Sequence, residues 1–397
     1  MSTCEQNTCC CPAQAEPNRT NPGPLAWFND MVPHALAYAQ TQKPAGHPLV
    51  GIMCEYAPRE LIMAAGGVPA CLCGGSAATI PAAERFLPAN LCPLIKSTFG
   101  YHVQQSNPFL EMADLVVAET TCDGKKKMIE LLSESHPVHV LELPQKPDEP
   151  DALAYWVQEL RKLKDALELR FGTEITESKL RDAIALMNRE RRLRRDLASL
   201  MQDDNPPLTG CELLNLKSII ACIPEDLAQY EQALRQLPGR KLDPPASQRI
   251  RVLLTGVPMP HGAEHVIEII EEHGGLVVCQ ENCSGLKPIL EDVDEQAEDP
   301  IQAIAEKYFH LPCSVMLHNN RRLDSISQLV ETYRPQCIIE VIWQACLTYD
   351  VESARVRRLA EEKLNLPYLR IETDYSRSDA ARVALRIEAL FETVHTR

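Results

Sequence analysis

Six cysteines lie in predicted loops of this 397-residue chain, and each half of the chain contributes three of them. The spacings are similar in the two halves, 38 and 30 residues in the first and 30 and 33 residues in the second. Related halves that each supply three thiols could hold two facing metal centres, so we expect the six to meet at one cleft. The first cysteine set is Cys54, Cys92 and Cys122, and the second cysteine set is Cys283, Cys313 and Cys346.

Thiolates are the usual ligands of iron–sulfur cubanes. Three thiolates per cubane leave one iron open to a bridging sulfide, a solvent molecule or a substrate. The residues after Cys122 suit an anionic cluster, because Asp123-Gly124 predicts a tight turn and the next helix would point its positive end at the site. The lysines at 125–127 add positive charge. The pattern predicts an iron–sulfur protein.

Two other interpretations of the six cysteines are open. Cysteine is among the most buried residue types, so these thiols could be ordinary core residues. Structural zinc sites are the second alternative, although zinc usually takes four ligands from closely spaced pairs and no CxxC occurs at these positions. Cys71 and Cys73 alternate along a predicted strand and are expected to pack in the core. Adventitious thiols are expected near the N-terminus, at Cys4, Cys9, Cys10 and Cys11.

The elements that must position the thiols alternate between strands and helices. Continuous apolar runs separated by helical stretches indicate parallel sheets covered on both faces. Four of the six cysteines follow the ends of such runs, where open α/β sheets bind their ligands. In the first half, strands are predicted over 48–53, 68–73, 113–119 and 137–143. In the second half, they are predicted over 249–256, 276–282, 337–343 and 366–373.

The segment between the halves has a different pattern. Residues 151–236 carry apolar side chains at helical spacing with dense charges between them, and residues 238–248 resemble a linker. We therefore predict an α/β chain with two doubly wound parallel-sheet domains joined by a helical segment. The predicted parts are a cysteine-rich tail over 1–24, an α/β domain over 25–150, a helical bridge and linker over 151–248, and an α/β domain over 249–397.

Composition limits the possible partners. A formal net charge of −15 argues against nucleic acid, whose phosphates need clustered Lys and Arg. No apolar run approaches the ~18 residues that cross a bilayer. The N-terminus lacks the apolar core of a secretion signal, so we expect no membrane association and a cytoplasmic location. No GxxxxGK[ST] motif occurs, so any use of ATP would belong to another protein.

Two further side chains are candidate catalytic proton donors. His261 follows a predicted strand at the ligand-binding edge, and Glu55 adjoins Cys54. Helix capping and simple solvent exposure are the alternative roles for both.

Several segments resemble the 2-hydroxyacyl-CoA dehydratase D-component family, and most closely its double-cubane cluster branch. The similarity runs from about Pro48 to the C-terminal region, and TTCDGKKKM is its most specific motif. The strongest segments are NLCPLIKS (90–97), ETTCDGKKKM (119–128), RDAIALMNRERR (181–192), ENCSG (281–285), QACLTYDVES (344–353) and LPYLRIETDYS (366–376).

The resemblance implies two Rossmann-like domains, with one cubane held by the first cysteine set and another by the second. In the double-cubane branch a sulfide bridges the two into one [8Fe-9S] unit; a [4Fe-4S] cluster is the alternative. The resemblance also implies a homodimer that receives electrons from an ATP-hydrolysing [4Fe-4S] reductase and reduces a small-molecule substrate. Two alternatives remain: a 2-hydroxyacyl-CoA dehydratase subunit that uses ketyl-radical chemistry, and an electron carrier without its own substrate.

Overall fold

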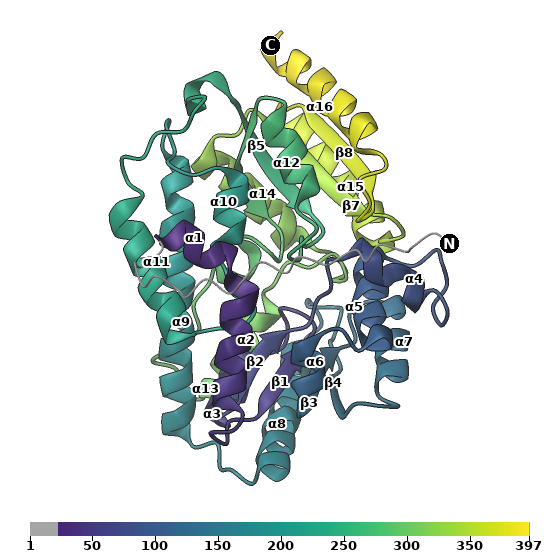
Figure 1. Ribbon diagram of the computed structural model, residues 1–397, viewed down its shortest axis with the longest axis vertical. Helices are drawn as coiled ribbons and strands as arrows, with labels where there is room; N and C mark the ends of the chain where they lie inside the picture. Colours follow the sequence, from purple (N-terminus) through teal and green to yellow (C-terminus); the bar gives the residue numbers. More distant parts are fainter. Residues whose placement is uncertain (1–22, 397) are drawn as a thin grey trace, which may run out of the picture.

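The computed structural model describes residues 23–396, which contain two parallel four-stranded sheets (Figure 1). The strand order is β2-β1-β3-β4 in the first sheet and β6-β5-β7-β8 in the second, so both sheets have the same topology. The predicted fold class, an α/β chain with two Rossmann-like parallel sheets, is confirmed. The strands are β1 (Leu49–Ile52), β2 (Val68–Cys71), β3 (Leu115–Glu119), β4 (Val138–Leu141), β5 (Ile250–Gly256), β6 (Gly275–Glu281), β7 (Cys337–Trp343) and β8 (Tyr368–Thr373).

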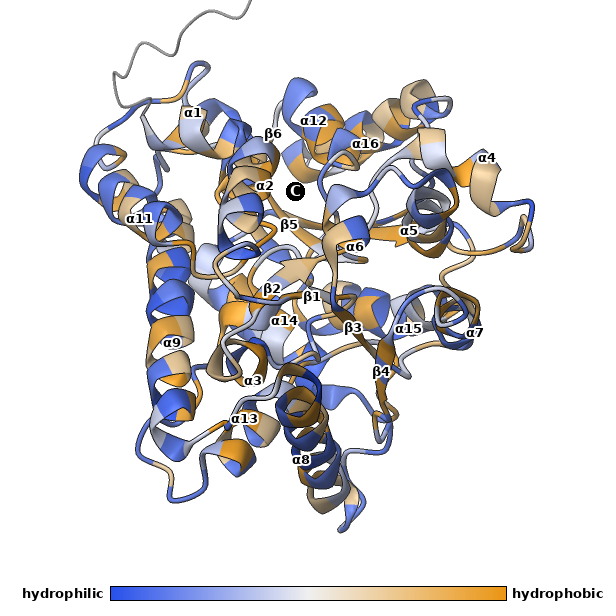
Figure 2. Ribbon diagram, turned by 60° about the horizontal axis from the view of Figure 1, so that its bottom comes forward, coloured by the Kyte–Doolittle hydropathy of each residue, from blue (hydrophilic) through white to orange (hydrophobic). Residues whose placement is uncertain are grey.

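Burial on both faces explains why the strand signals in the sequence are continuous rather than alternating. Every residue of β1, β3, β6 and β7 is buried. Such strands need apolar side chains on both faces, as parallel sheets under two helical layers do. Figure 2 shows the apolar strands at the centre and helices with hydrophilic outer faces around them.

Helices surround the two sheets, and we call each sheet with its helices a lobe. The helices before the second sheet are α1 (Pro24–Asn29), α2 (Met31–Gln42), α3 (Arg59–Ala64), α4 (Ile80–Ala83), α5 (Pro93–Gln104), α6 (Pro108–Met112), α7 (Asp123–Leu132), α8 (Ala152–Phe171), α9 (Glu177–Ser199), α10 (Gly210–Asn215) and α11 (Pro224–Gln236). The later helices are α12 (His265–Glu272), α13 (Pro300–Phe309), α14 (Asn320–Tyr333), α15 (Leu347–Arg358) and α16 (Ala380–His395).

The long helices α8 and α9 cover the first lobe and connect it to the second. α8 packs against β4, while α9 packs against α3 and against the residues around Pro288 of the second half. Local signals fix their ends. The Thr176 side chain accepts a hydrogen bond from the Lys179 backbone N–H at the start of α9, and α8 stops at Gly172, whose φ of 61° favours glycine.

The two lobes interlock through one segment of the second half. Residues 293–316, which include α13, contribute to a hydrophobic core that otherwise belongs to the first lobe. The Tyr56 hydroxyl donates a hydrogen bond to the Leu311 carbonyl at 2.9 Å, and Tyr308 donates to buried Glu60 at 2.8 Å. The domain boundaries predicted at 150 and 248 remain a prediction. The sequence pattern does not indicate that the segment 293–316 joins the hydrophobic core of the first lobe.

Among the described residues, no helix combines the length and apolarity that crossing a bilayer would require. The N-terminal thiols Cys4, Cys9, Cys10 and Cys11 lie outside the described residues.

Candidate metal centre

The first cysteine set lies at the carboxyl edge of the first sheet. Cys54 follows β1, and Cys122 follows β3 as the N-cap residue of α7. Cys92 is the N-cap residue of α5, with Pro93 in the first turn of that helix. Backbone N–H groups at both helix starts reach these sulfurs and favour their thiolate forms. The fold therefore presents Cys92 and Cys122 where an anionic ligand set is stabilised.

The second cysteine set is built in a similar way on the second lobe. Cys283 follows β6, and Cys346 follows β7 as the N-cap residue of α15. Cys313 comes after α13, inside the segment that enters the first lobe. This crossing segment thus delivers a second-set thiol against the first lobe.

The structure brings the two sets together. Burial raises the pKa of the Cys54 thiol, Lys125 opposes that rise, and the charges of Cys283 and Cys313 add to it. A hydrogen-bonding interaction joins the Cys92 and Cys346 thiols, lowering the pKa of Cys92 and raising that of Cys346. Thiols from both lobes thus share one electrostatic environment. Their role as ligands remains a prediction.

Burial likewise raises the pKa of Cys122, and the negative charges of Cys346 and Cys313 raise it further. All six are free cysteines; Cys92 is buried and the other five are partly buried. Among the described residues, no three His, Cys, Asp or Glu side chains are close enough to bind a single metal ion. A cubane cluster is larger than one ion, so its thiolates bind separate irons and stand farther apart.

Two buried lysines offset negative charge at the thiols. Lys125 Nζ lies 2.5 Å from Glu119 Oε2. Burial acts to lower the pKa of Lys125, but the negative charges of Glu119 and Cys54 outweigh it and raise the pKa. Lys287 Nζ lies 3.0 Å from Glu281 Oε1 and lowers the pKa values of nearby thiols that burial raises. Each lobe thus places one ammonium group beside its cysteine set, which suits an anionic cluster.

The donor groups around the thiols fit an iron–sulfur cluster. Tyr375 is 5% exposed, and its hydroxyl has no hydrogen-bond partner among the described residues. Burial raises the pKa of this phenol, and the nearby thiols Cys92, Cys73 and Cys346 raise it further. A buried hydroxyl without an acceptor is costly. A cluster sulfide would supply that acceptor.

Sequence reasoning missed the proximity of Cys73 to the first cysteine set. Cys71 packs against the first-lobe core as predicted, although it is only partly buried, whereas Cys73 is partly buried and lies near Cys54. The Cys73 thiol donates a hydrogen bond to the Met53 carbonyl at 3.5 Å, next to Cys54. A hydrogen bond with Cys73 lowers the pKa of Cys71 to about 7. Their place at the end of β2 was the available signal, since the same rule singled out Cys54.

The two candidate proton donors differ in surroundings. Both carboxylate oxygens of Glu55 accept hydrogen bonds from Arg59, at 2.9 and 3.1 Å. Burial acts to raise the pKa of Glu55, but Arg59 outweighs it and lowers the pKa. The His261 side chain is 54% exposed and lies 3.4 Å from Glu264, on a loop that touches Gly75. Glu55 is thus held as a carboxylate, while His261 remains open to solvent; the catalytic roles stay predictions.

Comparison with known proteins places the chain in one protein family. A profile of the family described as "2-hydroxyglutaryl-CoA dehydratase, D-component" matches residues 54–394. "Putative dehydratase subunit YjiM" of Escherichia coli (strain K12) is 43% identical over 360 residues, covering 88% of this chain and 92% of that protein. The (R)-phenyllactyl-CoA dehydratase beta subunit of Clostridium sporogenes is 22% identical, covering 92% and 97% of the two chains. A benzoyl-CoA reductase subunit of Thauera aromatica is 23% identical, covering 75% and 77%.

Proposed function

The chain belongs to the 2-hydroxyglutaryl-CoA dehydratase D-component family, and we propose that it is the cluster-bearing reductase of an ATP-driven electron-transfer system. In this proposal an ATP-hydrolysing [4Fe-4S] reductase supplies low-potential electrons, and the chain uses them to reduce a small-molecule substrate. The protein acts as a cytoplasmic homodimer.

The observation that carries the proposal is the meeting of both cysteine sets within one chain. The charges of Cys283 and Cys313 act on Cys54, and Cys92 interacts with Cys346, so thiols of the two lobes lie within electrostatic range of one another. Thiols of both lobes in one site are what two cubanes joined by a bridging sulfide would require. We therefore propose an [8Fe-9S] double cubane, with [4Fe-4S] as the alternative, held by Cys54, Cys92, Cys122, Cys283, Cys313 and Cys346.

When bound, the cluster would supply electron storage at low potential. The chain contributes positioning and electrostatics. Backbone N–H groups at the starts of α5, α7 and α15 favour the thiolate forms of the cysteines that cap them. Lys125 and Lys287 offset negative charge, and the Tyr375 hydroxyl holds a proton inside the site. The exposed His261 imidazole can exchange protons with solvent at the edge of the site.

A second function is favoured by the names of the relatives. One is a dehydratase beta subunit and another is a subunit of a reductase, so each works within an assembly of several chains. This chain could likewise be a subunit that dehydrates a 2-hydroxyacyl-CoA by ketyl-radical chemistry. Two complete cysteine sets in one chain favour the reductase.

Turnover with an ATP-dependent [4Fe-4S] reductase tests the proposal. The anaerobic, metal-loaded protein should reduce small triple-bonded or nitrogenous compounds only when the reductase and ATP are both present. Dehydration of an acyl-CoA without such reduction would establish the second function instead. Electron uptake without turnover of any substrate would contradict both and leave an electron carrier.

A further inference from the structure

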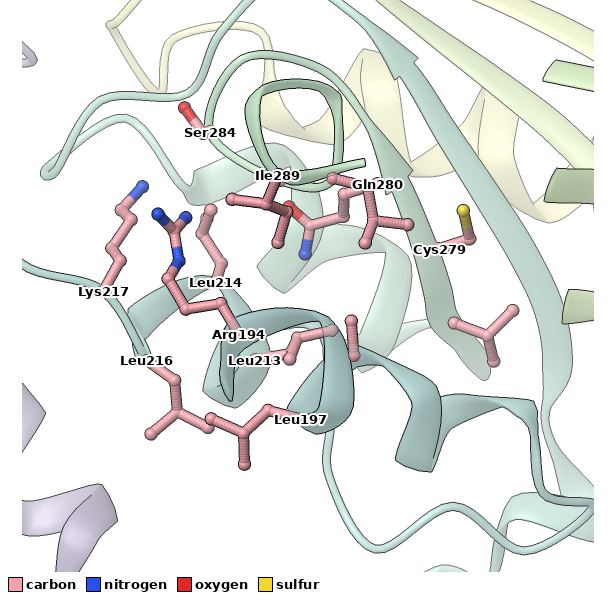
Figure 3. Close-up of a pocket in the computed structure, with 14 residues that line it drawn as sticks. Arg194, Leu197, Leu213, Leu214, Leu216, Lys217, Cys279, Gln280, Ser284 and Ile289 are labelled. Atoms are coloured by element: carbon pink, nitrogen blue, oxygen red, sulfur yellow. The ribbon is translucent and has the colours of Figure 1, made fainter. Parts of the chain in front are cut away.

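A small cavity behind the loop that carries Cys283 contains two positively charged side chains (Figure 3). The guanidinium of Arg194, from α9, and the ammonium of Lys217, from the loop after α10, project toward the same end of the cavity. Leucine and isoleucine side chains from α9, α10 and the 286–289 turn line the rest. The cavity is thus charged at one end and apolar at the other.

Neither cation forms a short ion pair within the described residues. The Arg194 side chain is 19% exposed, and its single ion pair within the described chain, from Nη1 to Glu190 Oε1, is long at 3.7 Å. Among the described residues, none accepts a hydrogen bond from its guanidinium, which carries five N–H donors. Within the same part of the chain, Lys217 donates only one bond, to the Met259 carbonyl at 3.3 Å. Both side chains are partly buried, and a ligand oxygen at this end of the cavity would give their free N–H groups a partner.

Both negative and positive groups act on the Lys217 ammonium. Burial lowers the pKa of Lys217 to about 8. The groups that face it are Glu264 and Glu55, which favour the ammonium form, Arg194, which disfavours it, and the thiol of Cys71. Two like charges in a partly buried cavity repel each other, and an anion between them would remove that repulsion.

A third group in the cavity also lacks a partner. Gln280 is 2% exposed, and its Oε1 accepts no hydrogen bond among the described residues, although its Nε2 donates to the Gly210 carbonyl. A water molecule held beside an anion would satisfy this oxygen. The unpaired donors and the unpaired acceptor together indicate a cavity built for a polar occupant.

We propose that this cavity binds a small carboxylate, held by Arg194 and Lys217 with its short aliphatic part against the leucines. The cavity volume is about 30 Å³, room for roughly two or three waters, which corresponds to formate or acetate rather than a larger acid. Ser284 lines the cavity and is the chain neighbour of Cys283, so a bound carboxylate would lie close to the second cysteine set. The site uses none of the six cysteines, so it is independent of the proposed function.

Calorimetric titration of the full-length protein with sodium acetate tests this site, with sodium chloride at equal ionic strength as the reference. The expected result is saturable acetate binding that chloride does not reproduce, in metal-loaded and metal-free protein alike. Arg194→Met and Lys217→Met should each weaken binding by about tenfold or more, because each removes a charge-assisted hydrogen bond. Arg189→Met, on the same helix but paired with Glu231 outside the cavity, should leave binding unchanged.

The pH dependence of acetate binding can be measured on the unmodified protein, so this test does not depend on whether the variants fold. Acetate affinity should fall between pH 7 and pH 9.5, because Lys217 loses its charge as the pH rises through its pKa of about 8. Acetate binding no better than chloride would overturn the proposal. So would an affinity that is constant over this pH range, or an equal loss in Arg189→Met.

Discussion

The two lobes have sheets of identical topology, but their cysteine sets do not begin at equivalent strands. β1 corresponds to β5, and β2 corresponds to β6. Cys54 follows the inner strand β1, whereas Cys283 follows the edge strand β6. Cys122 and Cys346 do follow equivalent strands, β3 and β7. The sets are therefore not simple copies, and the first-lobe counterpart of Cys283 is Cys73, just beyond β2.

The buried charges near the two sets differ as well. In the first lobe, Lys125 pairs with Glu119 alone, and the other Glu119 oxygen has no partner among the described residues. In the second lobe, Glu281 pairs with both Lys287 and Arg322. Arg322 also reaches Glu340 and Glu352. Lys125 and Glu119 thus form an isolated ion pair beside the first cysteine set, whereas Glu281 belongs to a cross-linked network.

The largest expected effect comes from removing the centre of that network. Arg322→Met leaves three buried carboxylates without their guanidinium, so we expect a loss of about 3–5 kcal/mol in the free energy of unfolding. Arg357→Met, which breaks an exposed pair with Glu361, should change it by less than about 0.5 kcal/mol. Denaturant unfolding measures both, and similar losses for the two variants would refute the contrast.

The lysines give a direct comparison of the lobes. Lys125→Met leaves Glu119 buried without a cation and should cost about 3 kcal/mol, with most of the loss recovered in Lys125→Met/Glu119→Gln. Lys287→Met should cost roughly half as much, because Glu281 keeps Arg322. The same unfolding experiment measures these variants. A greater loss for Lys287→Met would show that the network does not compensate for its missing lysine.

Cysteine variants sharpen the question of which first-lobe thiol matches Cys283. Cys54→Ser should lower the bound iron by about half, since one cubane loses a ligand. Cys73→Ser should keep nearly all the iron, because Cys73 is not among the six predicted ligands. Iron analysis of anaerobically purified variants decides this. Equal losses would make Cys73 a ligand by its topological equivalence to Cys283.

The smallest effect concerns reactivity in the metal-free protein. Cys71, with a pKa of about 7, should be alkylated faster than Cys279, whose pKa burial raises inside β6. The Cys71 rate should rise between pH 6 and pH 8 as its thiolate forms, and mass spectrometry of iodoacetamide-treated protein would follow both sites. A Cys73→Ala variant should slow alkylation of Cys71, because it removes the hydrogen bond that lowers the Cys71 pKa. Unchanged reactivity there would contradict the assigned cause.

Much of the fold follows from local sequence signals. The predicted strand over 337–343 has the bounds of β7, and the helical pattern over 151–236 contains α8, α9, α10 and α11. These signals are local, since burial on both faces imposes continuous apolar runs.

Long-range contacts could not be predicted in the same way. The apolar spacing in 293–316 shows that the segment is buried but not that it enters the other lobe. Tyr375 approaches the cysteine sets only through tertiary packing. The buried carboxylates Glu281 and Glu340 lie in strands and are paired by Arg322 from α14, which no sequence period indicates.

Iron and sulfide analysis of the anaerobically purified protein tests the central claim most directly. We predict about eight irons and nine sulfides per chain, the content of one double cubane held by both cysteine sets. About four irons per chain would instead favour a dehydratase-type subunit with one cubane. Stoichiometric zinc, or no metal after strictly anaerobic handling, would contradict the account.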